Sequence, residues 1–481
     1  MTDTAAVQDR LADGSLRSTT GLGERLPKPK GKKALTFAKA LVKVLQNCRG
    51  GDEASVQHAV RKALSKSVAI RQTFFLDRSA AALPNFDGHR PDFLLVRHSG
   101  KTQPHDVSAF VELKTDNTRL NLMHAQALRR IDWLLRLSCS RVRNVLWVCT
   151  LSPTQVVLYR AERPSVVAAW SVDFELLALG SDEASEALCR FFFATHADLG
   201  SFLPPEHGPL DLLGAGSTGA VFSLKSSVLK CSADTAAIDK ERTTYSKLNA
   251  AKVSSVFTLD STHKPGCLYL SHAIGTPLRS VLSDEDLEAA GVALFEVLAA
   301  GVVQRDVRAA NFVRVSGGGS TGLRLVDFAS AASVSRDPAV PSKSASPDGT
   351  FVTASDAVLD AFANETTYMP HPRDDWVSLL RMALYSRCPG IKQRIQRQIR
   401  GAEEPSTVAM AVKHVWSHVH STDGRAWLGL TPGLGETASA VLTEAHALPA
   451  NFDRDSGMAL LQRLLPVLPP ADATDETSPS P

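Results

Sequence analysis

The segment between residues 301 and 328 constrains the chain more than any other part of the sequence. An apolar lead-in ends at Asp306, Asn311 follows five residues later, and Asp327 closes a short apolar strand expected at 323–326. One carboxylate on a loop can orient an attacking hydroxyl, while an amide and a second carboxylate can hold Mg²⁺ on nucleotide phosphates. The spacing therefore predicts a site for phosphoryl transfer from ATP.

This pattern resembles the catalytic loop and the metal-binding Asp-Phe-Gly of eukaryotic-type protein kinases. The resemblance implies that Asp306 is the catalytic base and that Asn311 and Asp327 hold Mg²⁺. Two residues depart from the family pattern, since Gln304 stands where His is usual and Ala329 where Gly is usual. Ala is harder to place than Gly where φ is positive. Neither change removes a charged or metal-binding group, so we expect an active enzyme.

A glycine-rich stretch upstream has the spacing of a nucleotide-binding loop. Gly214, Gly216 and Gly219 are followed by Val221, with strand-like runs on both sides. A dinucleotide-binding domain would place a helix directly after the last glycine, whereas a hairpin is typical of kinases. In the family these glycines and the valine bind ATP, and Lys230 matches the lysine that reaches the phosphates.

Three further residues match supporting parts of a kinase. A helix expected at 234–248 carries Glu241 on its inward face, where a buried carboxylate needs a cation such as Lys230. The alternative is an ordinary surface glutamate. Asp375, near the start of an apolar helix, matches the aspartate that braces the catalytic-loop backbone. Arg305 matches an arginine that can bind a phosphate on the activation segment after Asp327.

The same region bears on the acceptor and on regulation. Arg308 replaces the lysine usual in Ser/Thr kinases, and the surrounding spelling occurs in some tyrosine kinases. The stretch 349–355 resembles the substrate-facing segment of casein-kinase-like enzymes, which favours Ser/Thr. We also expect one serine of the activation segment to be phosphorylated and to dock on Arg305. The candidates are Ser330, Ser333, Ser335, Ser342, Ser344 and Ser346.

A second pattern lies in the first third of the chain, where two helices, three strands, a helix and two strands are expected between residues 34 and 160. Glu112 and Lys114 lie on the third strand, and the period of two predicts that they share one face. Asp92, on the adjacent strand, can point to the same spot. Two carboxylates can hold a divalent metal while a lysine activates water.

These residues, in the pattern Pro-Asp then Glu-x-Lys, resemble the PD-(D/E)xK nuclease superfamily with its restriction-endonuclease-like fold. Glu53 on the preceding helix and Gln126 on the following one match positions where many members carry a further acidic residue and a Gln. The resemblance implies a Mg²⁺-dependent DNA nuclease. The alternative is that Asp92 and Glu112 are charges at strand edges and that Lys114 is a solvated strand end.

Composition sets broad limits. Apolar residues make up 44% and charged residues 21%, an ordinary globular balance, and a net charge of +3 is too small to imply a nucleic-acid or membrane partner. The seven cysteines form no Cys-x-x-Cys pair, which indicates a reducing compartment. The polar N-terminus predicts no signal peptide, and no apolar run is long enough for a membrane span. We expect an intracellular protein of the cytoplasm or nucleus.

Together the patterns predict an α+β chain with two domains. We expect a disordered tail at 1–33, a restriction-endonuclease-like α/β domain at 34–178, a bilobal kinase-like domain at 205–465 and a disordered tail at 466–481. The combination is similar to nuclease–kinase fusions among crinkler-type effectors and to the fungal-type protein kinases. The expected activity is ATP- and Mg²⁺-dependent phosphorylation of Ser/Thr in a protein substrate. The alternatives are a DNA nuclease regulated by the kinase-like half and a nucleotide-binding pseudokinase.

Overall fold

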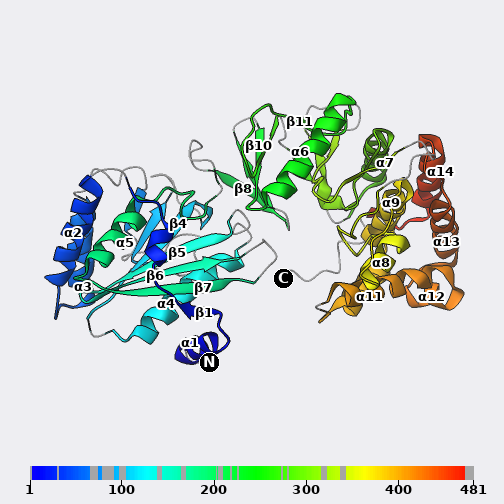
Figure 1. The fold of residues 1–481 in the computed structure, drawn as a ribbon. Helices are drawn as coiled ribbons and strands as arrows, with labels where there is room; N and C mark the ends of the chain where they lie inside the picture. The colour runs from blue at the N-terminus through cyan, green and yellow to red at the C-terminus, as the bar shows by residue number, and fades with distance from the viewer. Residues whose placement is uncertain are drawn as a thin grey trace. The chain divides into compact units, whose positions relative to one another are not determined.

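The structure is a computed structural model of a mixed α+β chain (Figure 1). The described residues are 3–29, 32–65, 74–77, 91–96, 104–116, 118–137, 143–163, 169–201, 203, 210–216, 219–224, 227–271, 275–278, 281–315, 322–335, 343–402 and 404–471. The contacts define two compact units. One unit comprises Met1–Lys225, Leu229–Ile238 and His263–Leu268, and the other comprises Ser226–Val228, Asp239–Thr262 and Tyr269–Pro481. The mixed α+β class is confirmed, while the expected domain boundaries stay a prediction.

The N-terminal sheet has the strand order β1-β7-β6-β5-β4-β3-β2, in which β1–β7 and β4–β5 are parallel and the other pairs antiparallel. Its strands are β1 (Leu16–Ser18), β2 (Phe74–Asp77), β3 (Phe93–Val96), β4 (Val107–Leu113), β5 (Val145–Leu151), β6 (Gln155–Glu162) and β7 (Ser171–Ala178). Five helices accompany it: α1 (Asp3–Ala12), α2 (Lys32–Gln46), α3 (Glu53–Ser65), α4 (Leu120–Arg136) and α5 (Asp182–Phe193).

The side chains of this sheet alternate between two apolar cores. Val111 and Leu113 on β4 point to the core that contains residues of α2, α3 and α5. Phe110 points to the opposite core, which contains residues of α4. This period of two is the strand geometry expected from the sequence. Both faces of the sheet are thereby buried, which explains its near-continuous apolar strands.

The N-terminal segment corrects the sequence analysis, which treated residues 1–33 as a disordered tail. β1 pairs in parallel with β7, and the 3₁₀ turn Leu22–Arg25 follows it. Leu16 and Leu22 are buried. The Glu175 carboxylate accepts the N–H groups of Gly21 and Gly23. A three-residue strand depends on a partner more than 150 residues away, so local composition does not reveal it.

The remaining strands form three small sheets. A five-stranded sheet has the order β11-β12-β10-β9-β8, a three-stranded sheet β13-β15-β16, and a pair β14-β17. Their bounds are β8 (Asp211–Ala215), β9 (Ala220–Ser223), β10 (Ser227–Cys231), β11 (Thr258–Leu259), β12 (Cys267–Ser271), β13 (Thr276–Pro277), β14 (Val302–Val303), β15 (Phe312–Arg314), β16 (Leu323–Leu325) and β17 (Ala332–Ser333).

Helices dominate the rest of the chain (Figure 1). They are α6 (Thr235–Ala250), α7 (Asp284–Ala299), α8 (Asp356–Ala363), α9 (Pro372–Arg387), α10 (Pro389–Ile399), α11 (Pro405–Ser417), α12 (Thr422–Trp427), α13 (Pro432–His446) and α14 (Arg454–Leu464). Almost every residue of α9 is buried. His371 and Asp374 form a capping box at its start, so this central helix begins at a defined residue.

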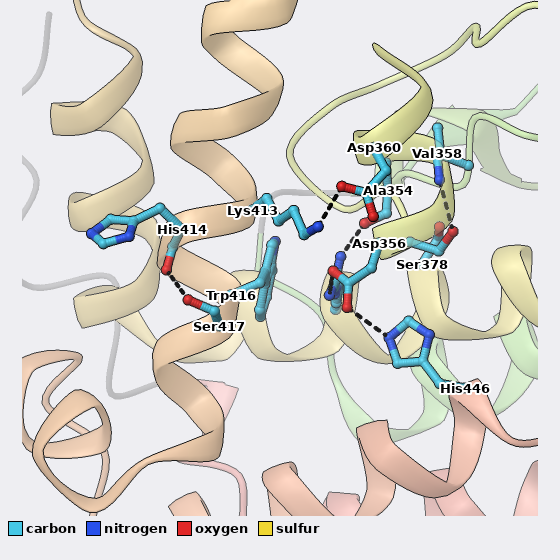
Figure 2. Close-up of polar contacts among 12 residues, drawn as sticks. Ala354, Asp356, Val358, Asp360, Ser378, Lys413, His414, Trp416, Ser417 and His446 are labelled. Atoms are coloured by element: carbon cyan, nitrogen blue, oxygen red, sulfur yellow. Dashed lines mark hydrogen bonds and ion pairs between the residues drawn. The ribbon is translucent and has the colours of Figure 1, made fainter. Parts of the chain in front are cut away.

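A polar cluster, buried only around Arg381, joins α8 to its neighbours (Figure 2). The Arg381 guanidinium of α9 donates to Asp356 at 2.6 Å and lies 5.0 Å from the ring centre of Trp416 on α11. Lys413 donates to Asp360, and His446 Nε2 lies 3.4 Å from Asp356 Oδ2. Because the Arg381 guanidinium is buried, the Asp356 carboxylate is needed to offset the free-energy cost of removing its charge from water.

The sequence analysis also expected a disordered tail at 466–481. Residues 472–481 lie outside the described residues, whereas Leu465–Val467 forms a 3₁₀ turn. Leu468 is buried, so the described part of the expected 466–481 tail is packed. In the described part of the chain, no helix combines the length and apolarity that crossing a membrane requires.

The packing of the N-terminal segment predicts a stability difference. Leu22→Ala, at a fully buried position, should lower the free energy of unfolding by about 2–4 kcal/mol because it leaves a cavity. Leu35→Ala removes an exposed leucine and should change the free energy of unfolding by less than about 0.5 kcal/mol. Urea unfolding followed by circular dichroism measures both. Equal, small effects would mean that the segment is not packed.

Candidate active site

The turn before Asp306 is strained and is held by one buried carboxylate. Arg305 has φ 69°, in the left-handed region that costs energy for a residue with a Cβ. The N–H groups of Gln304 and Arg305 donate to the two carboxylate oxygens of Asp375, at 2.5 and 2.9 Å. Burial raises the pKa of Asp375 to about 7, against the lowering effect of these two hydrogen bonds. Asp375 thus lies where the sequence predicted a brace.

Gln304, the first departure from the family pattern, connects the two halves of the site. Its side-chain Oε1 accepts the N–H of Asp306 at 2.9 Å. Its Nε2 donates to the carbonyl oxygens of Val326 and Asp327, at 3.4 and 3.2 Å. The amide therefore joins the backbone of Asp306 to the turn that carries Asp327.

Asn311 fixes the Asp306 side chain. Its Nδ2 donates to the carbonyl oxygen and to Oδ2 of Asp306, both at 2.8 Å. The Arg308 Nε lies 3.1 Å from the same Oδ2. Asp306 Oδ1 is buried and has no hydrogen-bond partner among the described residues. One oxygen of this carboxylate is thus held in place, while the other is left as an acceptor.

Asp327 lies beside this pair because strand pairing brings it there. Phe312 of β15 is opposite Leu325 of β16, and the N–H of Val326 donates to the carbonyl of Asn311 at 2.9 Å. Asp327 has φ 62°, so it is the left-handed residue of this turn. Ala329 is not among the residues with positive φ, and an alanine there carries no backbone strain.

Glu241 of α6 holds the residue after Asp327. Its Oε1 accepts the N–H of Phe328 at 3.1 Å, and the Phe328 ring packs edge-on against Tyr245, with ring centres 5.0 Å apart. Glu241 is almost fully buried, so the surface alternative is wrong. Its expected ion pair with Lys230 stays a prediction, since the two residues belong to different compact units.

The glycine-rich stretch forms the expected hairpin. On β8 and β9, Gly214 pairs with Val221, and the N–H of Gly216 donates to the carbonyl of Gly219 at 2.9 Å. No described atom lies within 4 Å of a Cβ added to Gly214 or Gly216. A Cβ on Gly219 would lie 2.5 Å from the Cys231 carbonyl oxygen, so only glycine fits there. Lys230 is buried on β10.

The residues present suit Mg²⁺ bound together with a nucleotide. Asn311 uses its amide nitrogen on Asp306, which orients its amide oxygen for another ligand. Asp327 adds a carboxylate, and oxygen is the ligand that Mg²⁺ prefers. Among the described residues no group of three or more His, Cys, Asp or Glu could hold a metal. Mg²⁺ in nucleotide sites takes only one or two carboxylates, with phosphates and water completing the shell.

The nuclease-like residues gather partly as predicted. Continuing the β3–β4 register by one residue places Asp92 opposite Glu112. The Asp92 carboxylate accepts Gln57 Nε2 at 2.6 Å and the N–H of Leu113 at 2.7 Å. Lys114 Nζ lies 4.0 Å from Asp92 and 3.2 Å from Glu53. Lys114 is buried, so the solvated strand end is wrong.

Glu112 departs from the expected arrangement. Its Oε1 accepts Arg130 Nε of α4 at 2.6 Å, whereas the Lys114 amine donates to Glu53 at the start of α3. Lys114 lies one residue beyond the end of β4, so strand alternation no longer directs its side chain. The other candidate, Gln126 on α4, has a buried Oε1 without a hydrogen-bond partner in the described part of the chain.

Two partners at this cluster were missed by the sequence analysis. Gln57 lies four residues after Glu53 on α3, so helical spacing could have indicated a shared face. Arg130 gives no such signal, because its approach to Glu112 depends on how α4 packs on the sheet. At the site around Asp306, the sequence analysis missed Tyr368, because its approach to Arg305 also depends on packing between distant segments. Its hydroxyl accepts Arg305 Nε at 2.9 Å.

Comparisons with known proteins add little. No protein-family model matches the sequence, and no curated protein matches it. Among solved structures, that of vaccinia related kinase 3 aligns with 53% of this chain and 86% of that chain, at 16% sequence identity and a TM-score of 0.36. A TM-score this low carries no argument about fold or function, so interpretation depends on the contacts described above.

Removing the Asp375 brace should destabilise the turn. Asp375→Ala leaves two buried N–H groups without acceptors, although it also removes a buried charge, and the net loss should be about 1–3 kcal/mol. Asp239→Ala, which removes an exposed aspartate paired with Arg242, should cost less than about 0.5 kcal/mol. Urea unfolding measures both. Equal losses would contradict a bracing role.

The buried Asp92 predicts a pH-dependent stability difference. Burial, then the neighbouring Glu112, raises the pKa of Asp92 from 3.8 to about 7. The folded protein therefore binds a proton that the unfolded chain releases, so this group stabilises the fold as pH falls from 7 toward 4. The free energy of unfolding of Asp92→Asn minus that of wild type should therefore be about 1 kcal/mol larger at pH 8 than at pH 6, because wild type loses this stabilisation and the variant does not. A pH-independent difference would contradict the raised pKa.

Proposed function

We propose that the chain is an ATP-dependent protein kinase, with Ser/Thr as the preferred acceptor. The observation that carries the proposal is how the two oxygens of the Asp306 carboxylate are bonded. Its Oδ2 is held by Asn311 and Arg308, while its buried Oδ1 has no partner among the described residues. An acceptor oxygen fixed in this way can orient a substrate hydroxyl and take up its proton.

The supporting residues have consistent roles. Asn311 and Asp327 supply oxygen ligands for Mg²⁺, which when bound neutralises charge on the phosphates. Gly214 and Gly216 leave the loop backbone open for phosphate, whereas Gly219 lets the loop pack closely against the Cys231 carbonyl. Together with Val221 and Lys230, these glycines form the proposed ATP-binding site. A protein acceptor and a preference for Ser/Thr are proposed from the sequence pattern at 349–355.

The nuclease alternative has less support. A metal would need the oxygens of Asp92 and Glu112, which in this structure are taken by Gln57, Leu113 N–H and Arg130. The donor set does not fit a metal in this arrangement, and we derive no step through one. Mg²⁺-dependent plasmid nicking that is lost in Glu112→Ala would favour the alternative and DNA as a partner.

Loss of the proposed base should abolish transfer. Asp306→Asn should lower the rate of γ-phosphate transfer from Mg-ATP to a generic protein acceptor by about 10²–10⁴-fold, because an amide cannot accept the hydroxyl proton. Asp423→Asn, a matched change at an exposed position on α12, should leave the rate unchanged. Radiolabel transfer measures the rate, and thermal stabilisation by Mg-ATP tests binding. Stabilisation without transfer in wild type would indicate a pseudokinase instead.

A further inference from the structure

The Arg305 side chain, expected to bind a phosphoserine, is already bonded to neutral groups. Its Nε donates to the Tyr368 hydroxyl at 2.9 Å, and its Nη1 donates to the carbonyl oxygen of Ser330 at 3.0 Å. Its Nη2 donates to the carbonyl oxygen of Ser346. Ser330 and Ser346 lie near the two ends of the segment 328–348, so one guanidinium connects them.

Tyr368 is fixed from two sides. Its backbone forms both hydrogen bonds of an antiparallel bridge with Ala345, at 2.8 and 3.0 Å. The Arg305 guanidinium lies 5.3 Å from the centre of its ring, which adds a cation–π attraction. Burial raises the pKa of Tyr368 to about 12, so the hydroxyl is neutral near pH 7 and can accept from arginine.

Further described residues of the activation segment (328–355) are docked by contacts within the same unit. Val302 and Val303 of β14 pair with Ser333 and Ala332 of β17. Thr353 Oγ1 donates to the carbonyl of Val307 at 2.9 Å. The segment also ends at a fixed point, because Ser355 Oγ donates to Asp374 at 2.9 Å.

Lys240 experiences the charges of both Arg305 and Asp348. Burial and then Arg305 lower the pKa of Lys240, while the carboxylate of Asp348 raises it, so the three charges act on one another. Of the predicted phosphorylation sites, Ser342 lies outside the described residues and Ser330 is buried.

We propose that Tyr368 is a positioning residue that, together with the carbonyl groups of Ser330 and Ser346, holds the activation segment on Arg305 without phosphorylation. The inference rests on the proposed kinase function and deepens it, since transfer then needs no phosphate on residues 328–355. It replaces the phosphoserine hypothesis with a neutral anchor built into the fold.

The experiment compares wild type, Tyr368→Phe and the matched control Tyr385→Phe, all after treatment with a protein phosphatase. Tyr385 is a half-buried tyrosine on α9 that hydrogen-bonds Gln396 rather than Arg305. Hydrogen exchange is followed at the amides of 344–353, and γ-phosphate transfer gives kcat and the KM for ATP. Tyr368→Phe should raise exchange about tenfold and lower kcat about tenfold, because it removes one hydrogen bond to a charged group.

The two readouts separate this inference from the proposed function. Dephosphorylated wild type should transfer phosphate, and Tyr368→Phe should leave the KM for ATP unchanged. Unchanged exchange in Tyr368→Phe, or a wild type that transfers phosphate only when residues 328–355 are phosphorylated, would overturn the inference. If wild type transfers no phosphate in either state, the proposed function fails, and the exchange measurement still decides whether Tyr368 anchors the segment.

Discussion

The site depends on one carboxylate that accepts two consecutive backbone N–H groups. Asp375 bonds the N–H groups of Gln304 and Arg305, and Arg305 is held in the left-handed region. That conformation costs about 1–2 kcal/mol for a residue with a Cβ, while each hydrogen bond to a charged group contributes about 1.5–3 kcal/mol. The bonds outweigh the strain, and the direction of the Asp306 side chain follows from the turn.

The carboxylate is effective because its helix is rigid. Asp375 lies in the first turn of α9, directly after a capping box, and the next residue, Trp376, is fully buried. The Trp376 indole N–H donates to the carbonyl of Gly457 on α14 at 3.1 Å. Arg305 then extends the same support, since its backbone bonds α9 and its side chain bonds the activation segment. Positioning of Asp306 and docking of that segment therefore share one residue.

Local spacing made part of the site predictable. Asp306 and Asn311 are five residues apart on one loop, and the hairpin that brings Asp327 beside them is short, so the sequence alone indicated this group. The N-terminal sheet was less accessible. The place of β1 beside β7, and the capture of Glu112 by Arg130, depend on packing between distant segments. No local period of 2 or 3.6 encodes such contacts.

The two departures from the kinase pattern are explained by hydrogen bonding and backbone conformation. A neutral imidazole offers one donor and one acceptor, and the Gln304 amide provides the same pair, accepting from Asp306 and donating to the Asp327 carbonyl. In the turn after β16, the residue with left-handed backbone is Asp327 and not Ala329. Glu241 accepts the N–H of Phe328, the residue after Asp327. Side chains thus support the left-handed residue in both turns. A glycine at 329 or a histidine at 304 is not needed for the arrangement, because its geometry is maintained by Asp375, Gln304 and Glu241.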